Sequence, residues 1–201
     1  MKLPISLCTL GLFAMIGAPA MLLEALRHGF AKTANEATDL LRALFYAIFS
    51  LGWLAAMIGL RRLYATGHGP LERLIATAPV ATLPFAVAQS LMDILKVPTD
   101  TLLYMVTDLA WPLSMVLTFA VSIAALFARQ LPGWHRLVPL LCGISLPVFL
   151  ILRVLTGQDL PGWTFGVHTA LGWFLLGYVV YVSQGKNSVS SWSPSAALEA
   201  R

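Results

Sequence analysis

The apolar stretch Leu102–Ala128, LLYMVTDLAWPLSMVLTFAVSIAALFA, indicates the class of fold. A helix needs about 20 apolar residues to cross a bilayer, so this stretch is long enough to do so. Asp108 interrupts it with a carboxylate, which is costly in hydrocarbon unless it is protonated, paired or facing water. Pro112 has no N–H to donate to the Asp108 carbonyl four residues earlier. The stretch therefore predicts a transmembrane helix that carries a polar site.

The composition of the whole chain is that of an integral membrane protein. Of its 201 residues, 58% are hydrophobic and only 11% are charged, and the mean hydropathy is +0.79. Soluble domains carry about 25% charged residues. The net charge of +4 is modest, and the basic residues lie at the ends of apolar segments, as topology signals do. We therefore expect a lipid bilayer as the main partner and no binding to nucleic acid.

Six apolar segments follow one another along the chain, and they predict an all-α polytopic protein with six transmembrane helices. Such segments must be helical, because lipid offers no partner to an open backbone. The short links between them predict that successive helices are antiparallel neighbours. The helical domain covers 1–184, and the Ser-rich stretch 185–201 is predicted to be a disordered polar tail. The six segments are 4–26, 40–60, 74–95, 102–128, 135–156 and 163–183.

The third and fifth segments share a spacing that predicts an internal repeat. Eleven positions separate Arg73 from Pro84 and Arg136 from Pro147. The first segment also contains a proline, Pro19. This pattern predicts three helical hairpins related by duplication, a frequent arrangement in membrane proteins.

Orientation in the membrane is predicted from the Lys and Arg residues around the six segments. Both termini and the links at 61–73 and 129–136 share one side, with eight basic residues: Lys2, Arg61, Arg62, Arg73, Arg129, Arg136, Lys186 and Arg201. The opposite side has five: Arg27, Lys32, Arg42, Lys96 and Arg153. Cytoplasmic links are enriched in Lys and Arg. We therefore expect a multi-pass protein of the bacterial cytoplasmic (inner) membrane with both termini in the cytoplasm.

With this topology, the polar residues within the helices lie toward the outer surface. At ~1.5 Å per residue, several of them are roughly 6–10 Å below that surface. We expect a polar cavity that opens outward, with apolar packing below it. Its predicted residues are Asp108, His168, Arg153, Glu24, Gln89, Asp93 and Tyr104, and a second set near its rim is Arg27, His28, Arg42 and Tyr46.

Several of these residues allow more than one role. Asp108 could form a structural ion pair with Arg153, or it could accept a proton or cation. Glu24 is predicted to stand beside Arg27 on one helix face, as an interfacial pair or as part of a site. His168 could be a packed, hydrogen-bonded side chain, a proton relay, or a ligand of a metal or haem.

The sequence contains no motif that identifies a reaction. HExxH, GxSxG, a P-loop and a dinucleotide fingerprint are all absent from it. The two cysteines, Cys8 and Cys142, lie in apolar runs without a CxxC motif and are predicted to be buried, inert thiols. We therefore assign no catalytic residue and no metal site, and the sequence indicates no particular cofactor.

Three functions are compatible with this pattern. The first is binding or transport of a small polar or ionic solute, coupled to protons through Asp108 and His168. The second is an intramembrane enzyme acting on lipid or a lipid-linked substrate, with His168 and Asp108 as an acid–base pair. The third is a non-catalytic membrane subunit whose charged residues fix helix packing.

Overall fold

The computed structural model describes residues 5–28, 40–157 and 161–183. Within these ranges the chain forms helices and turns and no strand, which confirms the predicted all-α class. The predicted tail at 185–201 lies outside the described residues. The elements are α1 (Leu7–Gly17), α2 (Ala20–His28), α3 (Leu40–Arg62), α4 (Pro70–Ile94), α5 (Leu102–Ala128), the 3₁₀ helix η2 (Gly133–Leu137), α6 (Val138–Gly143), α7 (Ser145–Thr156) and α8 (Gly162–Val182).

Five spans in the described part of the chain are long and apolar enough to cross a membrane, which supports a multi-pass membrane protein. A sixth is obtained if the bent pair Gly133–Gly143 and Ser145–Thr156 counts as one span. The third helix begins earlier than predicted, at Pro70, because a proline is well suited to the first helical position. The five spans are Leu7–Arg27, Leu40–Arg62, Pro70–Ile94, Leu102–Ala128 and Gly162–Val182.

The predicted helix at 135–156 is not a single straight helix. The chain bends by 49° between the part that ends at Gly143 and α7. Pro147 cannot donate to the Gly143 carbonyl, and glycine is itself a weak helix former. By contrast, α4 continues through both Pro79 and Pro84. The same Arg-to-Pro spacing is thus found in one continuous helix and in one bent pair of helices. The hairpin duplication stays a prediction.

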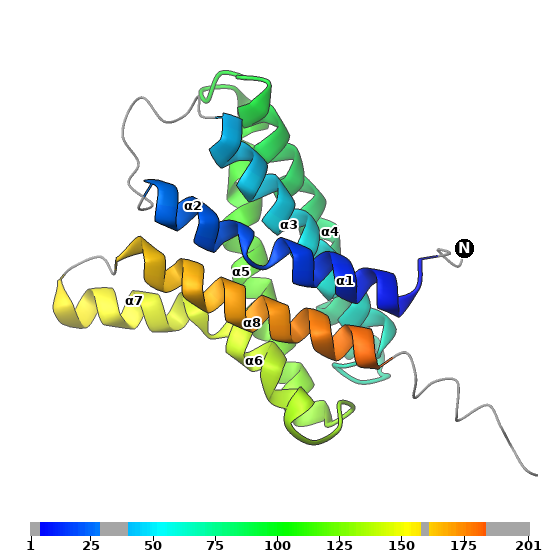
Figure 1. The fold of residues 1–201 in the computed structure, drawn as a ribbon. Coiled ribbons are helices and arrows are strands. Elements are labelled where there is room, and N and C mark those ends of the chain that lie inside the picture. Colours follow the sequence, from blue (N-terminus) through cyan, green and yellow to red (C-terminus); the bar gives the residue numbers. More distant parts are fainter. Residues whose placement is uncertain (1–4, 29–39, 158–160, 184–201) are drawn as a thin grey trace, which may run out of the picture.

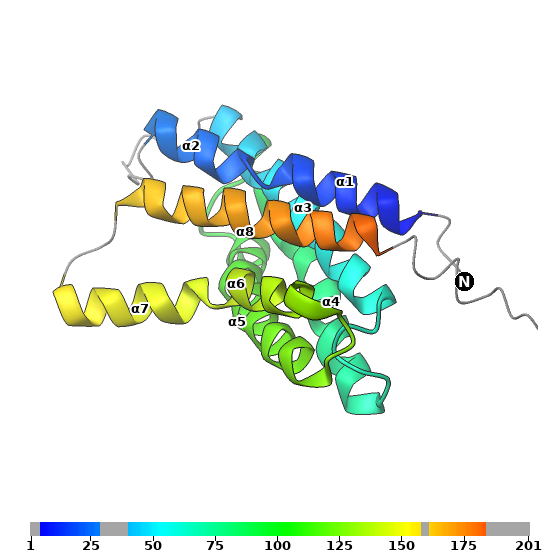
Figure 2. The same ribbon diagram turned by 60° about the horizontal axis from the view of Figure 1, so that its bottom comes forward.

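The helices pack around α3 and α8, as Figures 1 and 2 show. α1 lies beside both α8 and α3, and α4 packs between α3 and α5. Successive helices are therefore neighbours from α3 to α5, as predicted. The exception is α7, which projects from the bundle. Val154 and Leu155 near its end are 82% and 75% exposed, as expected of side chains that face lipid.

Glycines allow α1 to approach two of its neighbours very closely. A Cβ on Gly11 would lie 2.6 Å from the carbonyl oxygen of Gly177 in α8. A Cβ on Gly17 would lie 2.9 Å from the Cα of Gly52 in α3. Small residues at such crossings are the usual basis of helix packing in membranes. These contacts join the first helix to both the second predicted span and the last.

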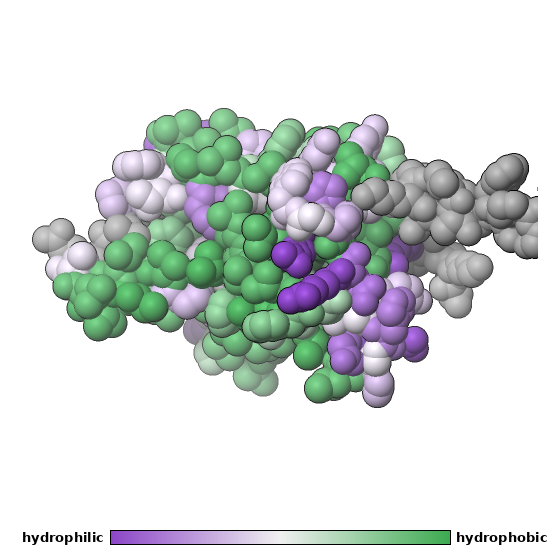
Figure 3. Space-filling view, turned by 90° about the horizontal axis from the view of Figure 1, so that it is seen from below, coloured by the Kyte–Doolittle hydropathy of each residue, from purple (hydrophilic) through white to green (hydrophobic). Residues whose placement is uncertain are grey.

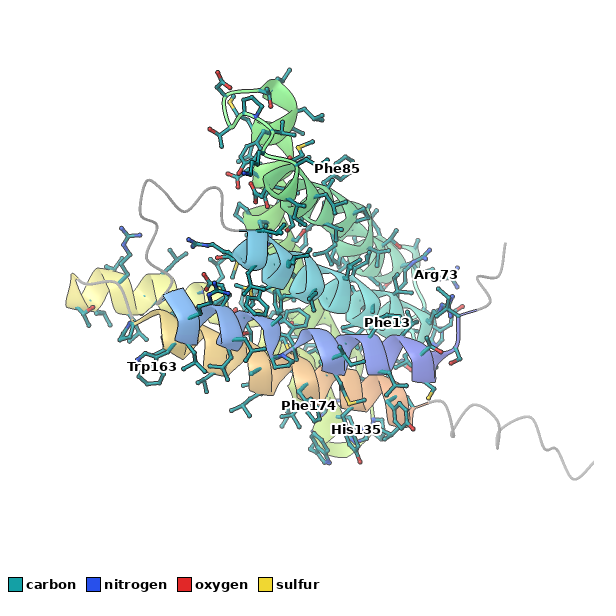
Figure 4. All side chains as sticks on the ribbon, turned by 45° about the horizontal axis from the view of Figure 1, so that its top comes forward. Phe13, Arg73, Phe85, His135, Trp163 and Phe174 are labelled. Atoms are coloured by element: carbon teal, nitrogen blue, oxygen red, sulfur yellow. The ribbon has the colours of Figure 1, made fainter. Side chains whose placement is uncertain are left out.

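The outer surface is rich in large hydrophobic side chains. Phe13, Phe85, Trp163 and Phe174 extend from the outer faces of α1, α4 and α8 (Figure 4), and each is about half exposed, from 48% to 57%. In the space-filling view, hydrophobic residues cover much of the visible face and hydrophilic residues gather on one side of it (Figure 3). This distribution suits a protein whose helices are surrounded by lipid.

Candidate functional site

Seven of the predicted site residues come together where α2, α3, α4 and α5 meet. Six of them form two groups held by hydrogen bonds, an ion pair or a ring contact, and Asp108 is close enough to the second group for its charge to act on it. We call this set the polar cluster, and its members are Glu24, Arg42, Tyr46, Gln89, Asp93, Tyr104 and Asp108.

The first group is a buried ion pair between α2 and α3. Glu24 is 0% exposed, and its Oε1 lies 3.3 Å from Nε of Arg42, whose side chain is 12% exposed. The Arg42 guanidinium also lies over the ring of Tyr46, 5.8 Å from its centroid. The sequence predicted Glu24 beside Arg27, and the structure corrects this partner, because Arg27 is exposed while Arg42 of the next helix reaches Glu24. His28 lies at the end of α2.

The second group is a network between the end of α4 and the start of α5. The Tyr104 hydroxyl donates to Oδ1 of Asp93 at 2.7 Å, and Nε2 of Gln89 donates to Oδ2 at 2.8 Å. Nε2 of Gln89 is also 3.2 Å from the Tyr104 hydroxyl oxygen. Both oxygens of Asp93 therefore accept a hydrogen bond, an arrangement that holds this carboxyl group in one orientation. The spacing of Gln89 and Asp93 predicted their shared face, and Tyr104 completes the network.

Electrostatic interactions link the two groups. Arg42 is close enough to Asp93, as well as to Glu24, for their charges to interact. Tyr46 is close enough to interact electrostatically with Arg42, Asp93 and Glu24. Asp108 acts on Asp93 and on Tyr104. When the three acids and Arg42 are ionised and both tyrosines are neutral, the cluster has three carboxylates and one guanidinium, which leaves two negative charges in excess. This excess attracts cations and repels anions.

Asp108 differs from the other acids because its side chain is exposed on α5. Among the described residues, none forms a hydrogen bond or ion pair with it. The alternative ion pair with Arg153 is therefore not formed. Arg153 lies on the projecting α7, where its side chain is exposed. Asp108 keeps a carboxylate available for a ligand at the edge of the polar cluster.

His168 has neighbours of a different kind. Its Nε2 lies 2.7 Å from the Leu141 carbonyl oxygen, which can only accept, so Nε2 is the donor. The ring also meets Phe149 edge-on at 6.4 Å. The other ring nitrogen, Nδ1, is buried without a partner in the described part of the chain. His168 thus joins α8 to the region of the bend between α6 and α7, while Asp108 belongs to the polar cluster.

The sequence did not predict a pocket lined by aromatic rings at the centre of the bundle. Its residues come from α3, α5, α6, α7 and α8, and it has about 270 Å³ of space free of protein atoms, counted with its open mouth. The pocket as a whole has room for about one water molecule. The sequence did contain a signal for this pocket. Membrane proteins usually place tryptophan at the membrane–water interface, whereas some tryptophans of this chain lie in the middle of the spans. The lining residues are Phe49, Trp53, Trp111, Met115, Thr118, Cys142, Ser145, Phe165 and Trp173.

The rings of this aromatic pocket contact one another directly. Trp53 lies 5.2 Å from Trp173 and 5.5 Å from Trp111, measured between centroids. Trp53 also donates its indole N–H to Thr118 Oγ1 at 3.1 Å, which joins α3 to α5. The predicted burial of Cys142 is confirmed, and it lies in the pocket wall, whereas Cys8 is only half-buried. The pocket is thus lined by aromatic rings from three helices, α3, α5 and α8.

Comparison of the chain with protein-family models, with curated proteins and with solved structures gives no match. Among residues 5–28, 40–157 and 161–183, no group of three or more His, Cys, Asp and Glu is placed to hold a metal ion. The function is therefore inferred from the polar cluster and the aromatic pocket.

Proposed function

We propose that this membrane protein binds a small cation, protons included, at the polar cluster and carries it across the bilayer. The observation that supports the proposal is the charge of the cluster, which contains three carboxylates and one guanidinium, and among the described residues Asp108 has no hydrogen-bond or ion-pair partner. Ionisable residues within transmembrane segments often mark ion pathways, because they are too costly to keep there without a use. In the predicted orientation, the cluster faces the outside.

In this proposal, the residues of the polar cluster have different roles. Asp93 is oriented by Gln89 and Tyr104, and Asp108 stands exposed beside this network. A cation near both carboxylates would replace part of its hydration by these oxygens. A proton could be held by either acid, and the Tyr104 hydroxyl already bonded to Asp93 offers a path for it. Arg42, held by Glu24, limits the negative charge on this side.

The two other interpretations receive less support from the geometry. An acid–base pair of His168 and Asp108 would need both groups to face one substrate, and Nε2 of His168 is occupied by the Leu141 carbonyl. A structural role accounts well for the Glu24–Arg42 pair, which joins two helices. It gives no reason for the exposed Asp108 within an apolar span.

Uptake of protons and Na⁺ into liposomes containing the purified protein tests the proposal. We expect Asp108→Asn and Asp93→Asn each to lower the uptake by about tenfold or more, because each removes one charge near the cation. Asp100→Asn is the matched control, because Asp100 is an exposed acid in the link between α4 and α5. Uptake that is equal in all four proteins, or absent from the wild type, would contradict the proposal.

A further inference from the structure

The aromatic pocket and the polar cluster adjoin each other. Trp111 lines the pocket, and its ring lies 5.8 Å from the ring of Tyr46, a member of the polar cluster. On α5, Trp111 is three residues from Asp108 and seven from Tyr104, so the three side chains share one face of the helix. A ligand in the pocket would therefore lie close to the negative charge of the cluster.

The lining of the pocket suits a positively charged group with an apolar body. Phe49, Trp53 and Trp173 are at least 95% buried, so their rings act in surroundings of low dielectric constant. The face of an aromatic ring attracts a cation, most strongly when the ring belongs to Trp and when water is excluded. Met115 adds a flexible side chain that adjusts to ligands of different shape.

Trp111 supplies a second, independent observation. Its indole Nε1 is buried, and no residue in the described ranges accepts a hydrogen bond from it. Such donors normally have a partner, which is either protein, water or ligand. By contrast, the neighbouring Trp53 donates to Thr118. A ligand with an oxygen acceptor beside its cationic centre would satisfy the N–H of Trp111.

We infer that the solute is a small organic cation of the quaternary ammonium type, whose apolar body is bound by the aromatic pocket. The inference rests on the proposed function, because the charge of the polar cluster favours a cation over a neutral ligand. Cys142 and Ser145, on the two sides of the bend between α6 and α7, form part of the pocket wall. The pocket has room for about one water molecule, so a ligand larger than water requires this wall to move outward.

Binding of labelled choline to the purified protein, with unlabelled competitors, tests the inference. Choline has a quaternary ammonium and a hydroxyl, and 3,3-dimethylbutan-1-ol has the same shape without the charge. We expect the neutral compound to compete at least about tenfold more weakly than choline, because cation–π attraction and the acidic cluster act on the charge alone. Equal competition by the two compounds would overturn the inference, since the pocket would then select only shape.

Substitutions of tryptophans that line the aromatic pocket test whether choline binds there. Trp111→Leu and Trp173→Leu should each weaken choline binding by about tenfold or more, because each removes a ring from the pocket. Trp163→Leu is the matched control, because Trp163 is 55% exposed at the start of α8 and should leave binding unchanged. If the leucine variants do not fold, Trp111→Phe keeps a ring at this position and should bind choline more weakly than the wild type. Full binding by folded variants without these rings would overturn the inference.

The inference and the proposed function can fail separately. If folded wild-type protein does not bind choline but its Na⁺ or proton uptake depends on Asp93 and Asp108, the aromatic pocket is not the site and the proposed function stands. If choline binding depends on Trp111 but no cation is taken up, the binding site stands and transport is contradicted.

Discussion

Two of the three acids in the polar cluster, Glu24 and Asp93, differ in their surroundings. Glu24 is wholly buried, and Arg42 offsets its charge at 3.3 Å. Asp93 is half-buried, held by the neutral donors Gln89 and Tyr104, and lies within range of a further acid, Asp108. The balanced pair joins α2 to α3, whereas the unbalanced group is the place where we propose that a cation binds. Substitutions at the two places should therefore affect different properties.

The largest effect on stability is expected from Glu24→Gln. Without the carboxylate, Arg42 loses its ion pair with the wholly buried Glu24, and breaking a buried ion pair by removing one partner costs about 3–5 kcal/mol. We expect a clear loss of thermal stability, measured as the midpoint of unfolding in detergent. The double variant Glu24→Leu/Arg42→Met removes both charges and should recover most of that loss. A single variant as stable as the wild type would show that Glu24 is not needed for helix packing.

A smaller effect is expected from Tyr104→Phe. It removes the hydroxyl that donates to Asp93, a hydrogen bond to an ionisable group worth about 1.5–3 kcal/mol when the acceptor is charged. Partial exposure of both side chains places the expected loss of stability at the low end of that range. Uptake of Na⁺ or protons should fall as well, because Asp93 is then less firmly oriented. Tyr64→Phe is a suitable control, since Tyr64 is an exposed tyrosine in the link between α3 and α4. An effect of the same size in this control would show that the hydrogen bond to Asp93 has no special role.

The smallest effect on stability is expected from Asp108→Asn. Asp108 is exposed and has no described partner, so the free energy of unfolding should change by no more than about 0.5 kcal/mol. The same variant should nevertheless lose cation uptake. Measuring both properties on one preparation separates the two roles. A large loss of stability would instead indicate that Asp108, like Glu24, is needed for helix packing.

The sequence predicted the helices better than the contacts between them. The apolar stretch of α5 has the bounds expected from its composition, and the i, i+4 spacing predicted that Gln89 and Asp93 share a face. The partner of Glu24 could not be predicted from spacing, because it depends on how α2 packs against α3. The aromatic pocket requires side chains from helices far apart in the sequence, such as Trp53 and Trp173, to meet at the same depth.

The effect of proline also depended on the surroundings. Pro84 lies within α4, which is packed between α3 and α5, and these neighbours hold the helix on both sides. Pro147 lies in the first turn of the projecting α7, which has few contacts with the bundle. The same residue is therefore accommodated in one place and accompanies a bend in the other. Sequence spacing alone does not contain this information.

The close approach of Gly11 and Gly177 has a consequence for biosynthesis. Chains emerge from the ribosome at about 5–20 residues per second, N-terminus first. α1 therefore enters the bilayer well before its glycine partner in α8 has been translated. During that interval, lipid or the insertion machinery must cover the glycine surface of α1, and a message cut short before the codons for α8 would leave this surface permanently uncovered.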